Sequence, residues 1–173
     1  MNAPSQFDKV EQVTSREHEF RDALVWMTQT LVHFATAEQA IGGLGRKLGL
    51  QNKTGPLDRL AELRAILSAA EGKKFKTLET RIARWAANRP FRNLLAHATI
   101  NILWDKDGEA VLVTRNLPID NEGHTPDRVW TCSERTELLR QVSNDARSIA
   151  DQIRNIIEDS AQLAKLRTTP DKA

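Results

Sequence analysis

A histidine, an arginine and an asparagine lie within six consecutive residues near the middle of the chain, in the segment Arg-Asn-Leu-Leu-Ala-His at 92–97. Histidine titrates near neutral pH and therefore suits general acid–base catalysis. Arginine keeps its positive charge and presents a planar fork of N–H donors that fits phosphate oxygens. Arg92 and His97 are thus two residue types that together suit chemistry on a phosphate group.

These side chains must be positioned by a helix. Pro90 disfavours the helical conformation at the residue before it and cannot donate a helix hydrogen bond, which predicts a helix break near Pro90 and a new helical turn from there. At about 100° per residue, Asn93 and His97 share one face, so the amide can hydrogen-bond the imidazole and fix its tautomer. Arg92 and His97 point roughly 140° apart. One copy therefore makes an open half-site that needs a second surface to close it.

This segment resembles the Arg-x(4 to 6)-His motif of the HEPN superfamily, whose active members are metal-independent ribonucleases. The family prefers a polar residue directly after the arginine, and here that residue is Asn93. The resemblance implies that two motifs from two subunits meet across a homodimer cleft. In that cleft His97 would act as general base on an RNA 2′-hydroxyl or as general acid to the leaving oxygen. Arg92 would stabilise the phosphorane, and Asn93 would position the phosphate or the imidazole.

The resemblance also suggests a biological role as a toxin or a phage-defence effector, with a cognate antitoxin or defence partner. Some HEPN toxins carry a tyrosine two residues after the histidine, which a partner nucleotidyltransferase modifies. That place is Thr99 in this chain, which contains no tyrosine. Control by tyrosine modification is therefore excluded.

Two other interpretations of the motif stay open. A HEPN-like dimer without catalytic activity could bind RNA, a nucleotide or another protein, for example as a component of a phage-defence or toxin–antitoxin assembly. Its sign would be Arg92 and His97 too far apart across any dimer, or a buried His97. In a plain helical protein, Arg92 would pair with a carboxylate such as Glu79 or one on the last helix, and His97 would be a buried residue bonded to a backbone carbonyl.

Positive charge is concentrated directly before the motif. Residues 44–92 hold 12 Lys or Arg against 4 Asp or Glu, a net charge of +8, whereas the whole chain has a net charge of +2. A basic segment beside a phosphate site suits RNA, because backbone phosphates supply most of the attraction. The simpler interpretation is a solvated helix face. The candidate RNA-binding residues are Lys73, Lys74, Lys76, Arg81, Arg84 and Arg89.

The composition is that of one ordinary globular domain, with 173 residues of which 40% are hydrophobic and 28% charged. The single cysteine, Cys132, excludes a disulfide framework or a thiolate metal site within one chain. No histidine or carboxylate cluster has metal-ligand spacing, so we expect neither a metal nor a cofactor. The polar start and the lack of a long apolar run predict a cytoplasmic protein without membrane contact.

The periodicity predicts a mainly α-helical, up-down bundle of four to five helices with a β-hairpin before a long C-terminal helix. Thr131 and Glu134 have the spacing of a capping box at the start of that helix, with Ser133 as the alternative cap. In the hairpin, Asp105 to Gly108 form the turn, and we expect His124 in the following loop to lie at the surface. The expected elements of the single HEPN-like domain, 1–173, are a helix at 14–48, a helix at 56–71, a helix at 76–98 with the break and the motif, a hairpin at 99–115, a loop at 116–132 and a last helix at 133–166.

Overall fold

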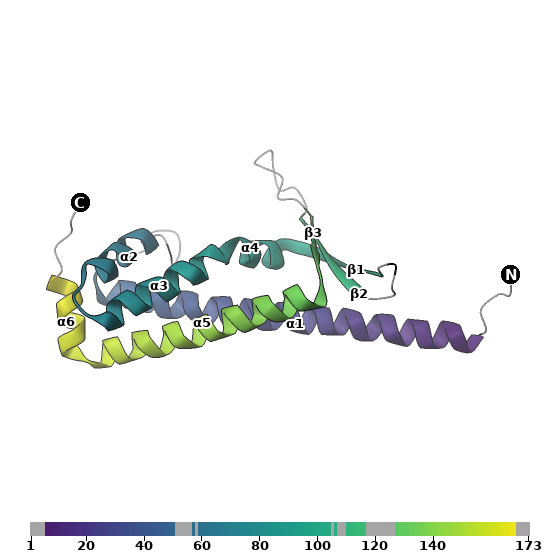
Figure 1. The fold of residues 1–173 in the computed structure, drawn as a ribbon, viewed down its shortest axis with the longest axis horizontal. Coiled ribbons are helices and arrows are strands. Elements are labelled where there is room, and N and C mark those ends of the chain that lie inside the picture. Colours follow the sequence, from purple (N-terminus) through teal and green to yellow (C-terminus); the bar gives the residue numbers. More distant parts are fainter. Residues whose placement is uncertain are drawn as a thin grey trace. The chain divides into compact units, whose positions relative to one another are not determined.

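The computed structural model describes residues 6–50, 57, 59–104, 106, 110–116 and 127–168, with the backbone alone at 6–16 and at Asn116. In this part the chain forms six helices and one three-stranded sheet, which lies between α4 and α5 in the sequence (Figure 1). The predicted fold class is confirmed: the chain is mainly helical, with strands before its long C-terminal helix. The elements are α1 (Gln6–Lys47), α2 (Leu60–Ala69), α3 (Lys73–Ala87), α4 (Arg89–His97), β1 (Ala98–Trp104), β2 (Ala110–Asn116), β3 (Arg128–Trp130), α5 (Cys132–Glu158) and α6 (Ser160–Thr168).

The chain divides into two compact units, and each is described by itself. The first unit comprises Met1–Leu31 and Phe91–Leu139, and the second comprises Val32–Pro90 and Arg140–Ala173. The first unit therefore holds the N-terminal part of α1, nearly all of α4, the sheet and the start of α5. The second holds the rest of α1 and α5 together with α2, α3 and α6.

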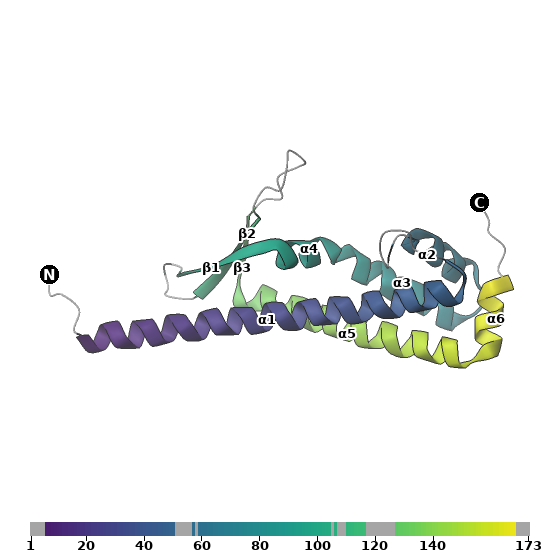
Figure 2. The ribbon, with the colours of Figure 1, turned by 180° about the vertical axis from the view of Figure 1, so that it is seen from behind.

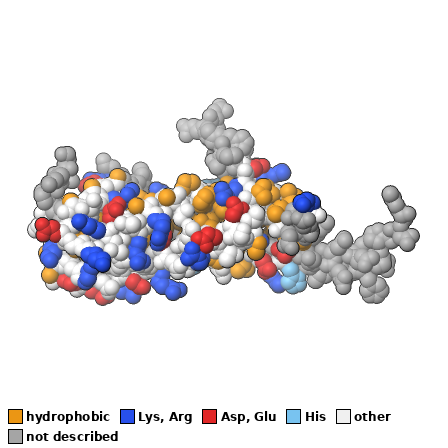
Figure 3. All heavy atoms as spheres, viewed as in Figure 1, with side chains coloured by type: hydrophobic (Ala, Val, Ile, Leu, Met, Phe, Trp, Pro, Cys, Tyr) orange, Lys and Arg blue, Asp and Glu red, His pale blue; other side chains and the backbone are white. Residues whose placement is uncertain are grey.

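An aromatic cluster forms the core of the first unit. Trp130 on β3 is 1% exposed, and its ring lies 5.3 Å from that of Trp26 on α1 and 5.4 Å from that of Phe91 on α4, between ring centroids. Its indole N–H donates to the hydroxyl of Thr114 on β2 at 3.0 Å, so its polar group is satisfied inside the core. On the face seen in Figure 3, hydrophobic side chains gather around the sheet.

The sheet is antiparallel in the order β1-β2-β3 (Figure 2). β1 pairs with β2 from Ala98 opposite Asn116 to Trp104 opposite Ala110, which confirms the predicted hairpin. The expected loop at 116–132 is wrong at residues 128–130, which form β3 on the other side of β2. Residues 105, 107–109 and 117–126, including most of the predicted turn and His124, lie outside the described residues.

The second unit is a helical bundle built on the apolar faces of α1, α3 and α5. Phe34 on α1 packs against Trp85 on α3 with 6.2 Å between ring centroids. Arg64 on α2 donates two hydrogen bonds to Glu79 on α3, at 3.0 and 2.7 Å. The α3 side chains Leu78, Ile82 and Trp85 are all fully buried.

Side-chain hydrogen bonds to backbone N–H groups mark the starts of α5 and α6. The capping box before α5 is confirmed, because the Thr131 N–H donates to Glu134 at 2.9 Å and the Glu134 N–H donates to the Thr131 hydroxyl at 3.2 Å. The single last helix at 133–166 is wrong at Asp159, whose carboxylate accepts the N–H groups of Ala161 and Gln162 and so starts α6. α1 begins at Gln6, eight residues before the predicted start.

Candidate functional site

The motif occupies the end of α4. At the end of α3, the Asn88 N–H donates to the carbonyl of Trp85 at 3.0 Å. α4 then starts at Arg89, with Pro90 in its first turn. Proline is tolerated there because a first-turn N–H has no acceptor within the helix. The predicted break near Pro90 is confirmed. His97 is the last residue of α4, and β1 begins at the next residue.

The apolar pair inside the motif turns the polar residues outward. Leu94 and Leu95 are 5% and 2% exposed and anchor α4, whereas Asn93 and His97 are exposed and Arg92 is half-buried. The buried histidine expected for a plain helical protein is therefore not found, and of the two signs of a non-catalytic HEPN-like dimer the burial of His97 is absent. The imidazole can be reached by a ligand from solvent.

Asn93 contacts the arginine of the motif. Arg92 Nη1 donates to Asn93 Oδ1 at 3.4 Å, a long and weak hydrogen bond. Within the described residues no hydrogen bond joins Asn93 to His97, so the role of Asn93 in fixing the histidine tautomer stays a prediction. In this structure the amide oxygen of Asn93 accepts instead from the guanidinium of the neighbouring residue.

Glu79, one of the carboxylates named as a partner of Arg92 in the plain helical interpretation, is engaged elsewhere. Glu79 accepts both hydrogen bonds from Arg64 within the second unit. That pair is part-buried and joins α2 to α3, which gives Glu79 a structural role of its own.

The sequence did not reveal the residues that hold the first turn of α4. The guanidinium of Arg128 on β3 lies 4.7 Å from the ring centroid of Phe91 and 4.3 Å from that of Trp130. Arg128 Nη2 also donates to Glu134 at 3.3 Å. Because Phe91 directly precedes Arg92, this stack of cation and rings fixes the backbone from which Arg92 projects. Residues 128–130 form a strand of three residues, which is too short for a periodic pattern in the sequence.

The six candidate RNA-binding residues all belong to the second unit and divide into two groups. Lys73, Lys74 and Lys76 are exposed on the first turns of α3, and two of them line a shallow depression of about 370 Å³. The arginines are more involved in packing. Arg81 donates to Ser148, and Arg89 is half-buried, with no hydrogen-bond partner for its Nε in the described part of the chain.

Arg84 forms an ion pair with Asp145 on α5, and its Nε donates to both carboxylate oxygens at 3.1 and 2.9 Å. This hydrogen bonding, followed by the charge of Asp145, raises the pKa of Arg84 above its ordinary value. The three lysines are thus better placed to meet an anionic ligand than Arg81 and Arg84.

No family model, curated protein or solved structure matches the chain. Within the described residues, no three His, Cys, Asp or Glu side chains gather as they would around a metal ion. In the same part of the chain, no helix combines the length and the apolar character needed to cross a membrane. The motif and its geometry in α4 are therefore the features of the chain that bear on function.

Proposed function

We propose that this chain is a HEPN-type, metal-independent endoribonuclease of the cytoplasm, with a composite site formed by two copies. The observation that carries the proposal is the outward position of His97, next to a half-buried Arg92 at the end of one short helix. An exposed imidazole can exchange protons with a bound substrate. A guanidinium held by neighbouring structure offers N–H donors to a phosphate at little entropic cost.

In the proposed reaction, His97 takes the proton of an RNA 2′-hydroxyl as the 2′-oxygen attacks the adjacent phosphorus. Arg92 donates hydrogen bonds to the phosphorane oxygens and stabilises their charge. The bond from phosphorus to the 5′-oxygen then breaks, and that oxygen receives a proton from an imidazolium, which leaves a 2′,3′-cyclic phosphate and a 5′-hydroxyl. Because Arg92 and His97 point roughly 140° apart on one helix, two copies can supply groups to opposite sides of the phosphate.

RNA attraction would come from the exposed lysines at the start of α3. Lys73, Lys74 and Lys76 lie within two turns of one another and project into solvent. Phosphate contacts of this kind are independent of sequence and weaken with salt.

The test is cleavage of a mixed RNA pool by the wild-type protein and His97→Ala, with EDTA present throughout and the product ends analysed. His18→Ala is the matched control, because His18 is also an exposed histidine of the first unit but lies outside the motif. We expect EDTA-resistant cleavage with 2′,3′-cyclic phosphate ends, retained by His18→Ala and lost in His97→Ala. Equal cleavage by all three proteins would overturn the proposal.

A second candidate function is a non-catalytic HEPN-like module that binds RNA, a nucleotide or another protein. It is favoured by one observation: in the described residues, no hydrogen bond orients the His97 imidazole. This candidate predicts that the folded wild-type protein binds RNA or a protein partner without cleaving it, and that His97→Ala leaves RNA cleavage at the same zero level.

The proposed activity fits a toxin or a phage-defence effector that acts with an antitoxin or defence partner. Induced expression of the wild-type chain would then arrest bacterial growth, and expression of His97→Ala at the same level would not. Growth arrest by both proteins would separate the toxicity from the proposed site.

A further inference from the structure

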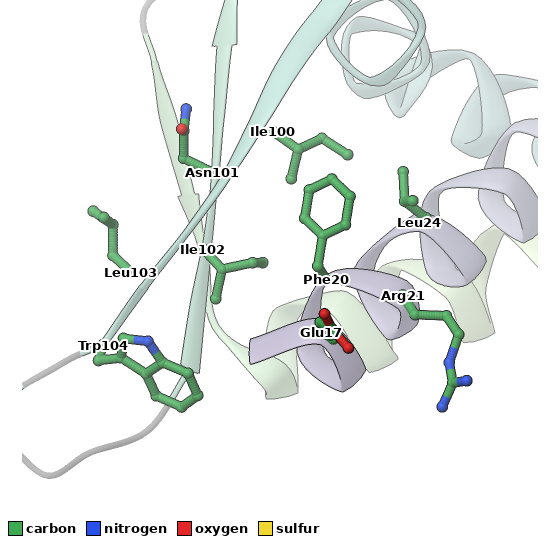
Figure 4. A pocket seen from close by; sticks show the side chains of 9 residues that line it. All are labelled: Glu17, Phe20, Arg21, Leu24, Ile100, Asn101, Ile102, Leu103 and Trp104. Carbon is green, nitrogen blue, oxygen red and sulfur yellow. The ribbon is translucent and has the colours of Figure 1, made fainter. Parts of the chain in front are cut away.

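A groove of about 870 Å³ lies between α1 and β1, entirely within the first unit (Figure 4). Its helical wall carries Glu17, Phe20, Arg21 and Leu24, and its other wall is the strand segment 100–104. Figure 4 shows Ile100 and Ile102 pointing toward Phe20 and Leu24, with Asn101 and Leu103 on the opposite side of the strand.

Large apolar side chains are exposed around this groove. Phe20 is 44% exposed, Leu24 43%, Leu103 50% and Trp104 39%. Single exposed apolar residues are ordinary, but a contiguous group around one groove marks an interaction surface.

The strand wall is open along its edge. β1 is the outer strand of the sheet and pairs with β2 alone in the sheet as described. Successive side chains of a strand point to opposite faces, so a groove lined by every residue of 100–104 follows the strand edge. Backbone N–H and C=O groups on that edge are available to a partner.

The charges on the helical wall are self-complementary. Positions 17, 20, 21 and 24 share one face of α1, and neither Glu17 nor Arg21 forms an ion pair within the described part of the chain. If a second copy is turned by a two-fold axis that passes midway between Glu17 and Arg21, its α1 runs antiparallel. Glu17 of each copy then faces Arg21 of the other, as an isologous interface requires.

We infer that this groove is the interface between two copies of the chain, with the α1 face and β1 edge of each docked on those of the other. The inference rests on the proposed function, since the composite site needs a second copy. It adds the surface that brings the copies together. Ile100, in the groove, is about 10 Å along the strand from His97. The interface therefore begins beside the motif.

The first experiment measures the mass of the full chain by sedimentation equilibrium, without RNA. We expect a dimer for the wild type and a monomer for Phe20→Arg, which places a charge in the groove. Val25→Arg is the matched control: Val25 is 48% exposed on the same helix and lies outside the groove lining. Circular dichroism checks that each variant keeps its helical content. A monomeric wild type, or equal effects of the two arginine substitutions, would overturn the inference.

A charge-reversal pair tests the two-fold arrangement. Glu17→Arg and Arg21→Glu each place like charges opposite each other twice per dimer, and each should raise the dimer dissociation constant on the order of tenfold. The double variant E17R/R21E restores opposite charges across the axis and should return the dissociation constant close to the wild-type value. Failure of the double variant to recover would reject the antiparallel pairing of the two α1 helices.

The outcomes for the interface and for the nuclease can be separated. A wild-type protein that dimerises through the groove but does not cleave RNA would support the proposed interface and reject the proposed nuclease activity. A wild-type protein that cleaves RNA and whose Phe20→Arg variant remains dimeric would support the nuclease activity and reject this interface.

Discussion

Arg84 and Asp145 form an ion pair in the second unit whose members differ sharply in exposure, with 61% of the arginine side chain exposed and 1% of the aspartate. Removing the arginine leaves a carboxylate in the core without its donor, whereas removing the aspartate leaves a guanidinium that can turn to water. We expect Arg84→Ala to lower the free energy of unfolding by about 2–3 kcal/mol, at or below the lower end for buried pairs because solvent screens the arginine.

Asp145→Ala should cost less than Arg84→Ala, and urea denaturation of the two variants measures both values. A larger loss for Asp145→Ala would show that the pair acts mainly by holding Arg84. The same asymmetry makes Arg84 a poor residue with which to test RNA binding, because its removal also changes folding.

We expect substitution of His97 to lower activity without lowering stability, and substitution of Trp85 to lower stability. His97 is exposed, so His97→Ala should leave the melting temperature nearly unchanged while RNA cleavage falls by about 10²- to 10⁴-fold. Trp85 is fully buried against Phe34, and Trp85→Ala should cost about 3–5 kcal/mol. Thermal melts and cleavage rates of both variants check this; unfolding of His97→Ala would indicate a structural histidine.

At the scale of elements, the capping box before α5 gives a prediction with a pH signature. The Thr131 backbone N–H, and then its hydroxyl, lower the pKa of Glu134 below its ordinary value of 4.5. A lowered carboxylate pKa stabilises the folded state at pH values above the ordinary pKa, and this stabilisation is lost as the pH falls through the lowered value.

The difference in melting temperature between the wild type and Glu134→Gln should therefore be constant near neutral pH and shrink below about pH 4.5. Thr131→Ala should cost about 1 kcal/mol at pH 7. A difference for Glu134→Gln that does not change with pH would mean that the carboxylate charge plays no part in the cap.

Elements with long or strongly marked patterns could be predicted from the sequence. Proline chemistry located the break before α4, alternation located the hairpin, and Thr131 with Glu134 located the start of α5. β3 could not be found, because its pairing with β2 is a long-range contact and a strand of three residues has too little periodicity. The exposure of Asn93 and His97 follows from the buried leucines between them, but the Arg92–Asn93 contact depends on side-chain conformations that spacing does not determine.

At the scale of the whole molecule, charge distribution leads to a prediction about RNA affinity. The chain has a net charge of only +2, so attraction to RNA depends on local clusters such as the three exposed lysines of α3. The triple variant Lys73→Ala, Lys74→Ala, Lys76→Ala should weaken binding to unrelated RNA sequences about equally. It should also reduce the slope of log affinity against log salt concentration by about 2, since single-stranded contacts contribute about 0.7 each.

Fluorescence anisotropy titrations at several salt concentrations measure this slope. Arg147→Ala, Arg154→Ala and Lys165→Ala provide a matched triple variant with the same loss of charge on exposed positions of α5 and α6. Equal slopes for the two triple variants would reject a specific role for the α3 lysines.

The intrinsic fluorescence of Trp104 can report whether the groove is covered. Of the four in the chain, Trp26, Trp85 and Trp130 are at most 6% exposed, and Trp104 is 39% exposed on the strand that lines the groove. Covering Trp104 would shift its emission to shorter wavelength and shield it from iodide, while the other three indoles would keep their spectra. A dilution series of the unlabelled protein would then show the monomer–dimer equilibrium as a shift in the emission wavelength of Trp104.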